Sequence, residues 1–286
     1  MKRTRYLAAL GLSLFILLVA CSPAVSVVLV TSTPDPNSTP NVVMVTATPT
    51  ATPTPGPKVN VYYEGYAQFE LISPGGRRVL IDVFDPDLLS SPPTEDDILL
   101  TTHRHDDHFL GSFAGSFPGE QILNEVGEID LPDVKIRGIA SAHGANELPV
   151  PRGGSNYIYV VDMAGLRFVH FGDIGQTELS QEQLDALGEV DVAMILIGGM
   201  CSASDGNSFN LLEQVQPRLV IPTHADMESL TRGVETWDAY YGAPGIYASD
   251  ITSVGIGRSD LSNETKFLML GEWAATYEID DLPEWP

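Results

Sequence analysis

Residues 103–108 read His-Arg-His-Asp-Asp-His, the part of the sequence best equipped for chemistry. They directly follow an apolar stretch that is typical of a buried strand. Histidines two positions apart on extended backbone point to the same side, so the imidazoles of His103 and His105 can converge on one cation. Asp107 and His108 come after the chain turns and can serve a second cation a few ångströms away. The alternative is a solvated, histidine-rich surface tract.

Three further candidate ligands occupy similar positions. His143, Asp173 and His224 each follow a short apolar run rich in β-branched residues. Side chains that follow different strands can meet at one edge of a sheet, so these three can reach the same place as the first four. The chain has six histidines, and five of them stand in such positions. A solvated tract does not explain that concentration. For the sixth, His170, a buried structural role is favoured.

The elements that must position these groups begin near residue 59. From there, apolar runs alternate with turn clusters, and strand patterns give way to a mixture of strands and helices. Turn signals at residues 73–76 and 163–165 separate neighbouring runs, as in hairpins. The pattern predicts a layered α/β sandwich in one domain over residues 59–286. We expect strands at residues 59–63, 67–72, 79–84, 98–102, 134–140, 157–162, 166–171, 191–197 and 218–222, and helices after Ser180 and at residues 208–215 and 229–240.

The region 227–286 gives the weakest signals. Its aromatic residues are expected to pack in the core or at sheet edges rather than to bind a ligand. Turns are expected near Gly242 and Gly255.

The N-terminal residues predict export. Residues 1–20 have the basic start and apolar centre of a signal peptide. Leu18-Val19-Ala20-Cys21 resembles a bacterial lipobox, in which the cysteine is acylated. The alternative is an ordinary secretory signal with an incidental cysteine. Residues 21–58 are predicted to be a Thr/Pro-rich disordered stalk. We therefore expect an extracytoplasmic lipoprotein that meets the membrane only through a lipid anchor at Cys21.

Charge narrows the range of partners. Acidic residues outnumber basic ones 38 to 15, which gives a net charge of −23 at pH 7. Such a field repels phosphate backbones, so nucleic acid is not expected as a partner, and a small-molecule substrate is. Cys21 and Cys201 are the only cysteines, so no disulfide framework is expected, and Cys201 is favoured as a small buried residue. The sequence leaves the oligomeric state open.

The order His-x-His-x-Asp-His, then His, then Gly-Asp, then His resembles the metallo-β-lactamase superfamily of hydrolases. The resemblance covers roughly residues 59–226. Short segments such as Val79-Leu80-Ile81-Asp82 resemble those of the branch that includes L-ascorbate-6-phosphate lactonase-like proteins. The resemblance implies a four-layer αββα sandwich of the metallo-β-lactamase type. Gly65-Tyr66 stands where many relatives carry Gly-His, so the substrate contacts of the family are not carried over.

The resemblance also implies a role for each candidate ligand. Asp82 would orient a ligand histidine. Imidazole and carboxylate groups suit Zn²⁺ best, with Mn²⁺ or Fe²⁺ as alternatives. Seven side chains would hold two divalent metal ions: His103, His105 and His143 the first, Asp107, His108 and His224 the second, and Asp173 both.

The implied chemistry is hydrolysis. A hydroxide bridging the two metals would attack an ester, lactone or phosphoester, with Asp107 orienting it as a catalytic residue. β-Lactamases of this fold usually have cysteine in place of Asp173, and di-iron oxidoreductases usually have glutamate in place of His105. The alternative from another class is a membrane-tethered, non-catalytic binding lipoprotein that retains the fold and the metal site. The arginines that could contact a phosphate are few and isolated, namely Arg104, Arg137, Arg152 and Arg232. Their scarcity favours a neutral or weakly charged ester or lactone as the substrate.

Overall fold

The structure, a computed structural model, describes residues 56–144, 150, 153–197, 205–224, 246–249, 251–271 and 285. They belong to a compact unit that runs from Pro55 to Pro286. The expected signal peptide, nearly all of the expected stalk, the expected helix at residues 229–240 and Cys201 lie outside the described residues. Within the described part of the chain, the helices are too short or too polar to cross a membrane.

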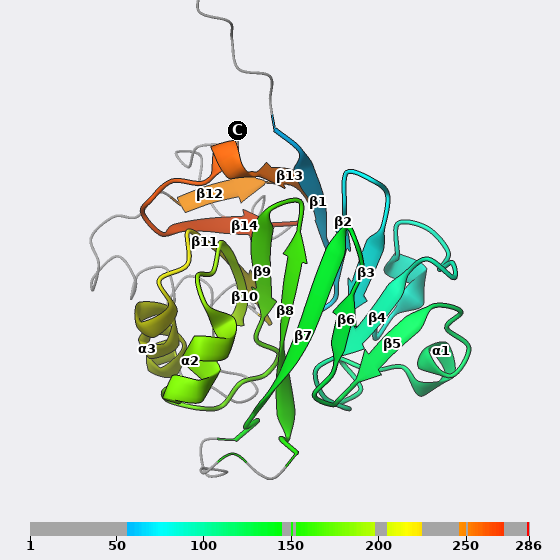
Figure 1. The fold of residues 1–286 in the computed structure, drawn as a ribbon, viewed down its shortest axis with the longest axis horizontal. Coiled ribbons are helices and arrows are strands. Elements are labelled where there is room, and N and C mark those ends of the chain that lie inside the picture. Colours follow the sequence, from blue (N-terminus) through cyan, green and yellow to red (C-terminus); the bar gives the residue numbers. More distant parts are fainter. Residues whose placement is uncertain are drawn as a thin grey trace, which may run out of the picture. The chain divides into compact units, whose positions relative to one another are not determined.

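The domain is built on two mixed β-sheets that pack face to face (Figure 1). The six-stranded sheet has the spatial order β13 (Ser253–Gly257), β1 (Lys58–Tyr63), β2 (Phe69–Ile72), β3 (Arg78–Ile81), β4 (Ile98–Thr101) and β5 (Glu120–Leu123). The eight-stranded sheet has the order β12 (Ile246–Ser249), β14 (Lys266–Leu270), β11 (Leu219–Thr223), β10 (Val192–Leu196), β9 (Leu166–His170), β8 (Asn156–Met163), β7 (Val134–Ser141) and β6 (Glu128–Asp130).

The main core lies between the two sheets. Successive side chains of a strand point to opposite faces, so alternate residues supply this core. Phe69 and Leu71 of the six-stranded sheet pack there with Tyr159, Phe168 and Met194 of the eight-stranded sheet, all fully buried.

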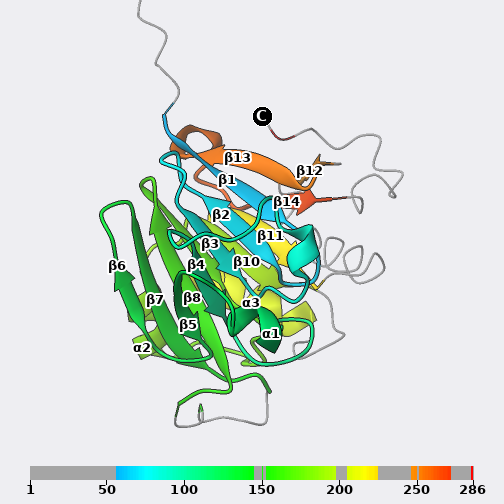
Figure 2. The same ribbon diagram turned by 90° about the vertical axis from the view of Figure 1, so that its right-hand side faces the viewer.

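Helices cover the outer faces (Figure 2). The outward side chains of the eight-stranded sheet, such as Ile158 and Val169, pack under α2 (Gln181–Leu187) and α3 (Asp205–Val215). The six-stranded sheet is covered by the single turn α1 (Gly111–Ala114) and the loops beside it. The predicted α/β sandwich of the metallo-β-lactamase type is therefore confirmed.

The nine expected strands are confirmed, with ends displaced by up to three residues. The strand expected at residues 79–84 ends at Ile81 because Asp82 takes the left-handed backbone conformation (φ 52°). The helix expected after Ser180 begins at Gln181, where Ser180 and Gln183 form a reciprocal capping box.

Five strands were missed: β5, β6, β12, β13 and β14. The turn expected near Gly255 was wrong, because Gly255 lies within β13 and pairs with Asn60 of β1. The sequence Ser-Val-Gly-Ile-Gly of β13 has too few side chains to display the alternation of a strand. β5 and β6 are mostly exposed, so polar residues hide their pattern as well.

Candidate metal centre

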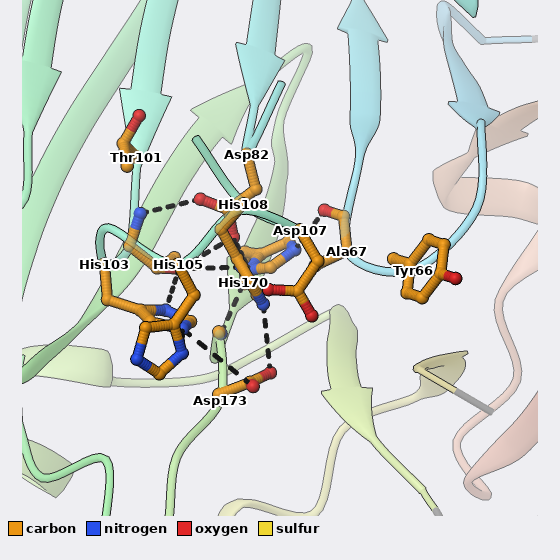
Figure 3. A network of polar contacts seen from close by, with 12 residues as sticks. Tyr66, Ala67, Asp82, Thr101, His103, His105, Asp107, His108, His170 and Asp173 are labelled. Atoms are coloured by element: carbon orange, nitrogen blue, oxygen red, sulfur yellow. Dashed lines mark hydrogen bonds and ion pairs between the residues drawn. The ribbon is translucent and has the colours of Figure 1, made fainter. Parts of the chain in front are cut away.

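The C-terminal ends of four strands deliver the seven predicted ligands to one place. Three of these strands are buried and mostly apolar, and the fourth, β7, buries alternate residues. Burial fixes each strand in its sheet and leaves the polar residue after it at the sheet edge. The tract at residues 103–108 follows β4, His143 follows β7, Asp173 follows β9 and His224 follows β11. Figure 3 shows His103, His105, Asp107 and His108 of this tract gathered beside Asp173.

One group of donor atoms comes from His103, His105 and His143, whose nearest ligand atoms all lie within 4.8 Å of one another. The His103 Nε2 and His105 Nδ1 atoms are 3.1 Å apart. The ring centroid of His143 lies 4.7 Å from that of His103 and 4.7 Å from that of His105. His103 is buried and His105 is exposed, so this group runs from the interior to the surface.

A second group comes from Asp107, His108 and His224, also within 4.8 Å of one another. The Nε2 atoms of His108 and His224 are 2.8 Å apart, and the two rings are stacked. The Asp107 Oδ2 atom lies 4.0 Å from His224 Nδ1. His108 and His224 are buried, whereas a third of the Asp107 side chain is exposed.

Asp173 lies between the two groups and is 1% exposed. Its Oδ2 atom is 3.9 Å from His103 Nε2 and 3.7 Å from His143 Nε2. Its Oδ1 atom is 3.3 Å from His108 Nε2 and 3.2 Å from His224 Nε2. One carboxylate oxygen therefore faces each group of histidines.

The donor atoms fit divalent cations. Nitrogen atoms of four imidazoles converge on the two oxygens of Asp173, the mixture of ligands that Zn²⁺ takes in proteins. The buried Nε2 atom of His143 makes no hydrogen bond with the described part of the chain. A buried nitrogen left in this way normally has a partner, and a cation in the first group would supply one.

The electrostatics of the cluster also favour positive charge at its centre. Burial lowers the pKa of His108, but the carboxylates of Asp82 and Asp173 outweigh it and raise that pKa to about 10. Burial and then the charge of His108 lower the pKa of His103 to about 3. Burial raises the pKa of Asp173, yet the neighbouring imidazoles of His108 and His143 hold that pKa well below its ordinary value. Asp173 is therefore an anion that neighbouring positive charge stabilises.

Asp82 fixes the orientation of His108. Its fully buried carboxylate accepts hydrogen bonds from the backbone N–H and the hydroxyl of Thr102, both at 2.7 Å. The same carboxylate lies 2.8 Å from His108 Nδ1. Asp82 therefore keeps the proton of His108 on Nδ1, and a cation that displaced the second proton would find the lone pair of Nε2 on the side of Asp173 and His224.

Sequence reasoning missed the function of Asn156, at the start of β8. Its amide nitrogen donates to Ser141 Oγ and to the carbonyl of Phe171, both at 2.8 Å, and its Oδ1 accepts from the N–H of Asp173 at 3.1 Å. Asn156 thus holds the turn that carries Asp173. The only signal in the sequence is an amide at the head of an apolar run.

Gly172, in the same turn, has φ 54°, and a Cβ atom there would collide with Asn156 and with Thr102. The tight contact requires glycine at this position.

His170 is fully buried and holds the backbone beside the cluster, which agrees with the structural role favoured for it. Its Nε2 donates to the carbonyl of Ala67 and its Nδ1 accepts from the N–H of Gly172, each at 3.0 Å.

Of the four arginines considered as phosphate contacts, the two in the described part of the chain make other contacts. Arg104 is exposed and lies over the ring of Phe109, and Arg137 pairs with Glu128. Arg152 and Arg232 lie outside the described residues.

The fold and the donor cluster at its strand ends are together those of the metallo-β-lactamase superfamily. The model of the family described as the beta-lactamase superfamily domain matches residues 60–224. The chain belongs to this family.

Curated relatives and solved structures are similar to it. A UPF0173 metal-dependent hydrolase of Thermoplasma acidophilum is 26% identical over 214 residues, covering 66% of this chain and 93% of the relative. A UPF0173 protein of Pyrococcus furiosus is 26% identical over 187 residues, covering 58% and 83%. A Thermotoga maritima structure, assigned as a Zn-dependent hydrolase of the superfamily, shares the fold with a TM-score of 0.54 at 19% identity, covering 74% of this chain and 99% of that one.

Proposed function

We propose that the protein is a dinuclear metal-dependent hydrolase. The observation that carries this proposal is the placement of Asp173, which turns one oxygen to each of two groups of donor atoms. The names of the relatives as metal-dependent hydrolases support it.

Seven side chains would bind the two metal ions. His103, His105 and His143 would hold one ion, Asp107, His108 and His224 the other, and Asp173 both. Two divalent cations held in this way supply Lewis acidity and lower the pKa of water enough to make hydroxide available near neutral pH. Zn²⁺ suits these ligands best, and Mn²⁺ and Fe²⁺ are the alternatives.

Asp107 is the candidate for moving a proton. Its carboxylate stands at the edge of the cluster, a third exposed, while His108 and His224 beside it are buried. His105, in the other group of donor atoms, is exposed as well, so solvent reaches both groups. Water and substrate can approach beside Asp107, so Asp107 is placed to accept a proton from the attacking water and to pass it to the leaving group.

The substrate is proposed to be an ester, lactone or phosphoester, with preference for a neutral ester or lactone. A net charge of −23 repels phosphate groups, and Arg104, the arginine within the ligand tract, packs on Phe109. The resemblance to the branch that includes L-ascorbate-6-phosphate lactonase-like proteins is the reason to include lactones among the proposed substrates.

Hydrolysis is tested with zinc-loaded protein on three substrates: phenyl acetate, a γ-lactone and bis(4-nitrophenyl) phosphate. We expect turnover of an ester or the lactone that chelation abolishes and zinc restores. Tightly bound zinc with no turnover of any of the three would contradict the proposal, and would instead match a non-catalytic binding protein.

We also propose that the protein is an exported lipoprotein anchored at Cys21. The support is the resemblance of residues 18–21 to a lipobox and the Thr/Pro-rich segment after them. Metabolic labelling with palmitate should mark the wild type and not Cys21→Ala. Equal labelling of both would contradict the anchor.

A further inference from the structure

Tyr66, in the turn between β1 and β2, combines two features that cost stability. Its backbone is left-handed (φ 48°), a conformation that residues with a Cβ atom rarely adopt. Its side chain is 55% exposed, so burial of the ring gives little in return. Glycine or asparagine would suit this backbone better. The fold therefore does not explain why a large aromatic residue stands here.

The turn that carries Tyr66 is held by the same residues that build the metal centre. The carbonyl of Tyr66 accepts from the backbone N–H of His224 at 2.9 Å and from the hydroxyl of Tyr63 at 3.2 Å. The next carbonyl, of Ala67, accepts from His170 Nε2 at 3.0 Å. Strained backbone persists where surrounding contacts enforce it, and such places cluster at functional sites.

Gln68 fixes a second aromatic residue beside Tyr66. Its buried Oε1 atom accepts from the N–H groups of Phe84 and Asp85, both at 3.0 Å, which ties the loop after β3 to this turn. The ring of Phe84 then meets the ring of Tyr66 edge-on, with centroids 5.2 Å apart.

The other neighbour of the Tyr66 ring is His224, again edge-on, with centroids 5.7 Å apart. A row of rings thus leads from Phe84 through Tyr66 to a candidate ligand of the second metal. Figure 3 shows Tyr66 beside the cluster, on the side where Asp107 lies. Asp107 is a third exposed, so a substrate can reach the cluster on this side.

We infer that Tyr66 is a specificity-determining residue, which forms an aromatic wall for a flat apolar group next to the bond that is cleaved. The inference rests on the proposed function and narrows its substrate class to esters or lactones with an aryl or similar planar substituent. An exposed ring that is held rigidly offers its face for stacking at little entropic cost.

The test measures binding rather than turnover. Benzohydroxamate and acetohydroxamate bind metals through the same group and differ by a phenyl ring in place of a methyl group. Calorimetry with the zinc-loaded full chain gives the ratio of their affinities for the wild type, Tyr66→Phe, Tyr66→Asn and Gln216→Asn. Gln216 is the matched control, because it has the same φ of 48° and an exposed side chain but precedes β11, whereas His224 follows it.

We expect the wild type to prefer benzohydroxamate and Tyr66→Asn to lose about tenfold of that preference, the scale of one aromatic contact. Tyr66→Phe and Gln216→Asn should retain the preference. Tyr66→Asn should unfold at a temperature no lower than the wild type, because asparagine relieves the backbone strain.

Three results would overturn the inference: an unchanged ratio in Tyr66→Asn, an equal loss for both hydroxamates, or no binding of either one to the zinc-loaded wild type. The proposed function fails separately, by absence of turnover. If the wild type prefers benzohydroxamate but hydrolyses none of the three substrates, the role of Tyr66 is supported and the proposal that the protein is a hydrolase is refuted.

Discussion

Replacing Asp82 by asparagine should weaken metal binding while leaving the fold intact. Asparagine keeps the shape of the side chain and tolerates the left-handed backbone (φ 52°). Its oxygen can still accept from the N–H of Thr102, now 2.7 Å from the carboxylate. Its amide nitrogen, however, would face His108 Nδ1, which must then become an acceptor. The proton would move to Nε2, the atom that points at Asp173 and His224.

The expected loss is about 10- to 100-fold in affinity for the second metal, the usual effect of removing a partner that orients a ligand. That range corresponds to about 1.4–2.7 kcal/mol. Asp82→Ala is the contrasting variant. It leaves the buried N–H of Thr102 without its acceptor, which costs about 1–3 kcal/mol, and it places alanine in the left-handed region. It should therefore destabilise the metal-free protein as well.

Competition between each variant and a zinc chelator gives the affinities, and thermal unfolding of the metal-free proteins gives their stabilities. The reasoning is refuted if Asp82→Asn binds two equivalents of zinc as tightly as the wild type. It is also refuted if Asp82→Asn loses as much stability as Asp82→Ala, since the carboxylate would then serve the fold rather than the metal site.

Three further outcomes are expected. His105→Ala should lose metal-dependent turnover yet change the free energy of unfolding by no more than about 0.5 kcal/mol, because the side chain is exposed. Arg104→Ala, at the adjacent exposed residue, is the control. Full activity in His105→Ala would contradict the assignment of His105 as a metal ligand. Burial, and then a hydrogen bond shared with Glu70, raise the pKa of Glu64 to about 9. The folded state therefore keeps a proton on Glu64 that the unfolded chain has lost, and the free energy of unfolding should fall as pH rises from about 5 to about 9. The upper limit of this fall is about 1.4 kcal/mol per pH unit, and solvent at the partly exposed side chain makes the actual fall smaller. Denaturant titrations at pH 5.5 and 8.5 should show this loss in the wild type and not in Glu64→Gln, and identical profiles would argue against it. Gly172→Ala should destabilise the protein by about 2–4 kcal/mol in thermal unfolding, because its Cβ atom meets Asn156 and Thr102; a variant as stable as the wild type would show that the turn can relax.

The sequence predicted three of the four strands that carry candidate ligands, β4, β9 and β11, because nearly all of their residues are buried. The fourth, β7, was predicted as well, although it has exposed residues on one face. Ile98–Thr101 and Leu219–Thr223 are fully buried runs made mostly of apolar residues, and such runs stand out locally. The residues that follow them could therefore be assigned to one sheet edge.

Features that depend on distant parts of the chain could not be read in this way. The pairing of β13 with β1 joins Gly257 to Lys58, and no local pattern in either strand specifies the other. Likewise the support of Asp173 by Asn156 and the left-handed backbone of Tyr66 arise from packing between segments. The position of Asp173 between the two groups of histidines was implied by the family resemblance and not by any local pattern.

The amount of zinc bound per chain is the most direct test of the dinuclear centre. Native mass spectrometry of the chelator-treated, zinc-reconstituted protein should show two ions in the wild type, and none tightly bound in Asp173→Asn, because this carboxylate faces both groups. A wild type that takes up one ion or none, or an Asp173→Asn variant that still holds two, would contradict a shared two-metal site.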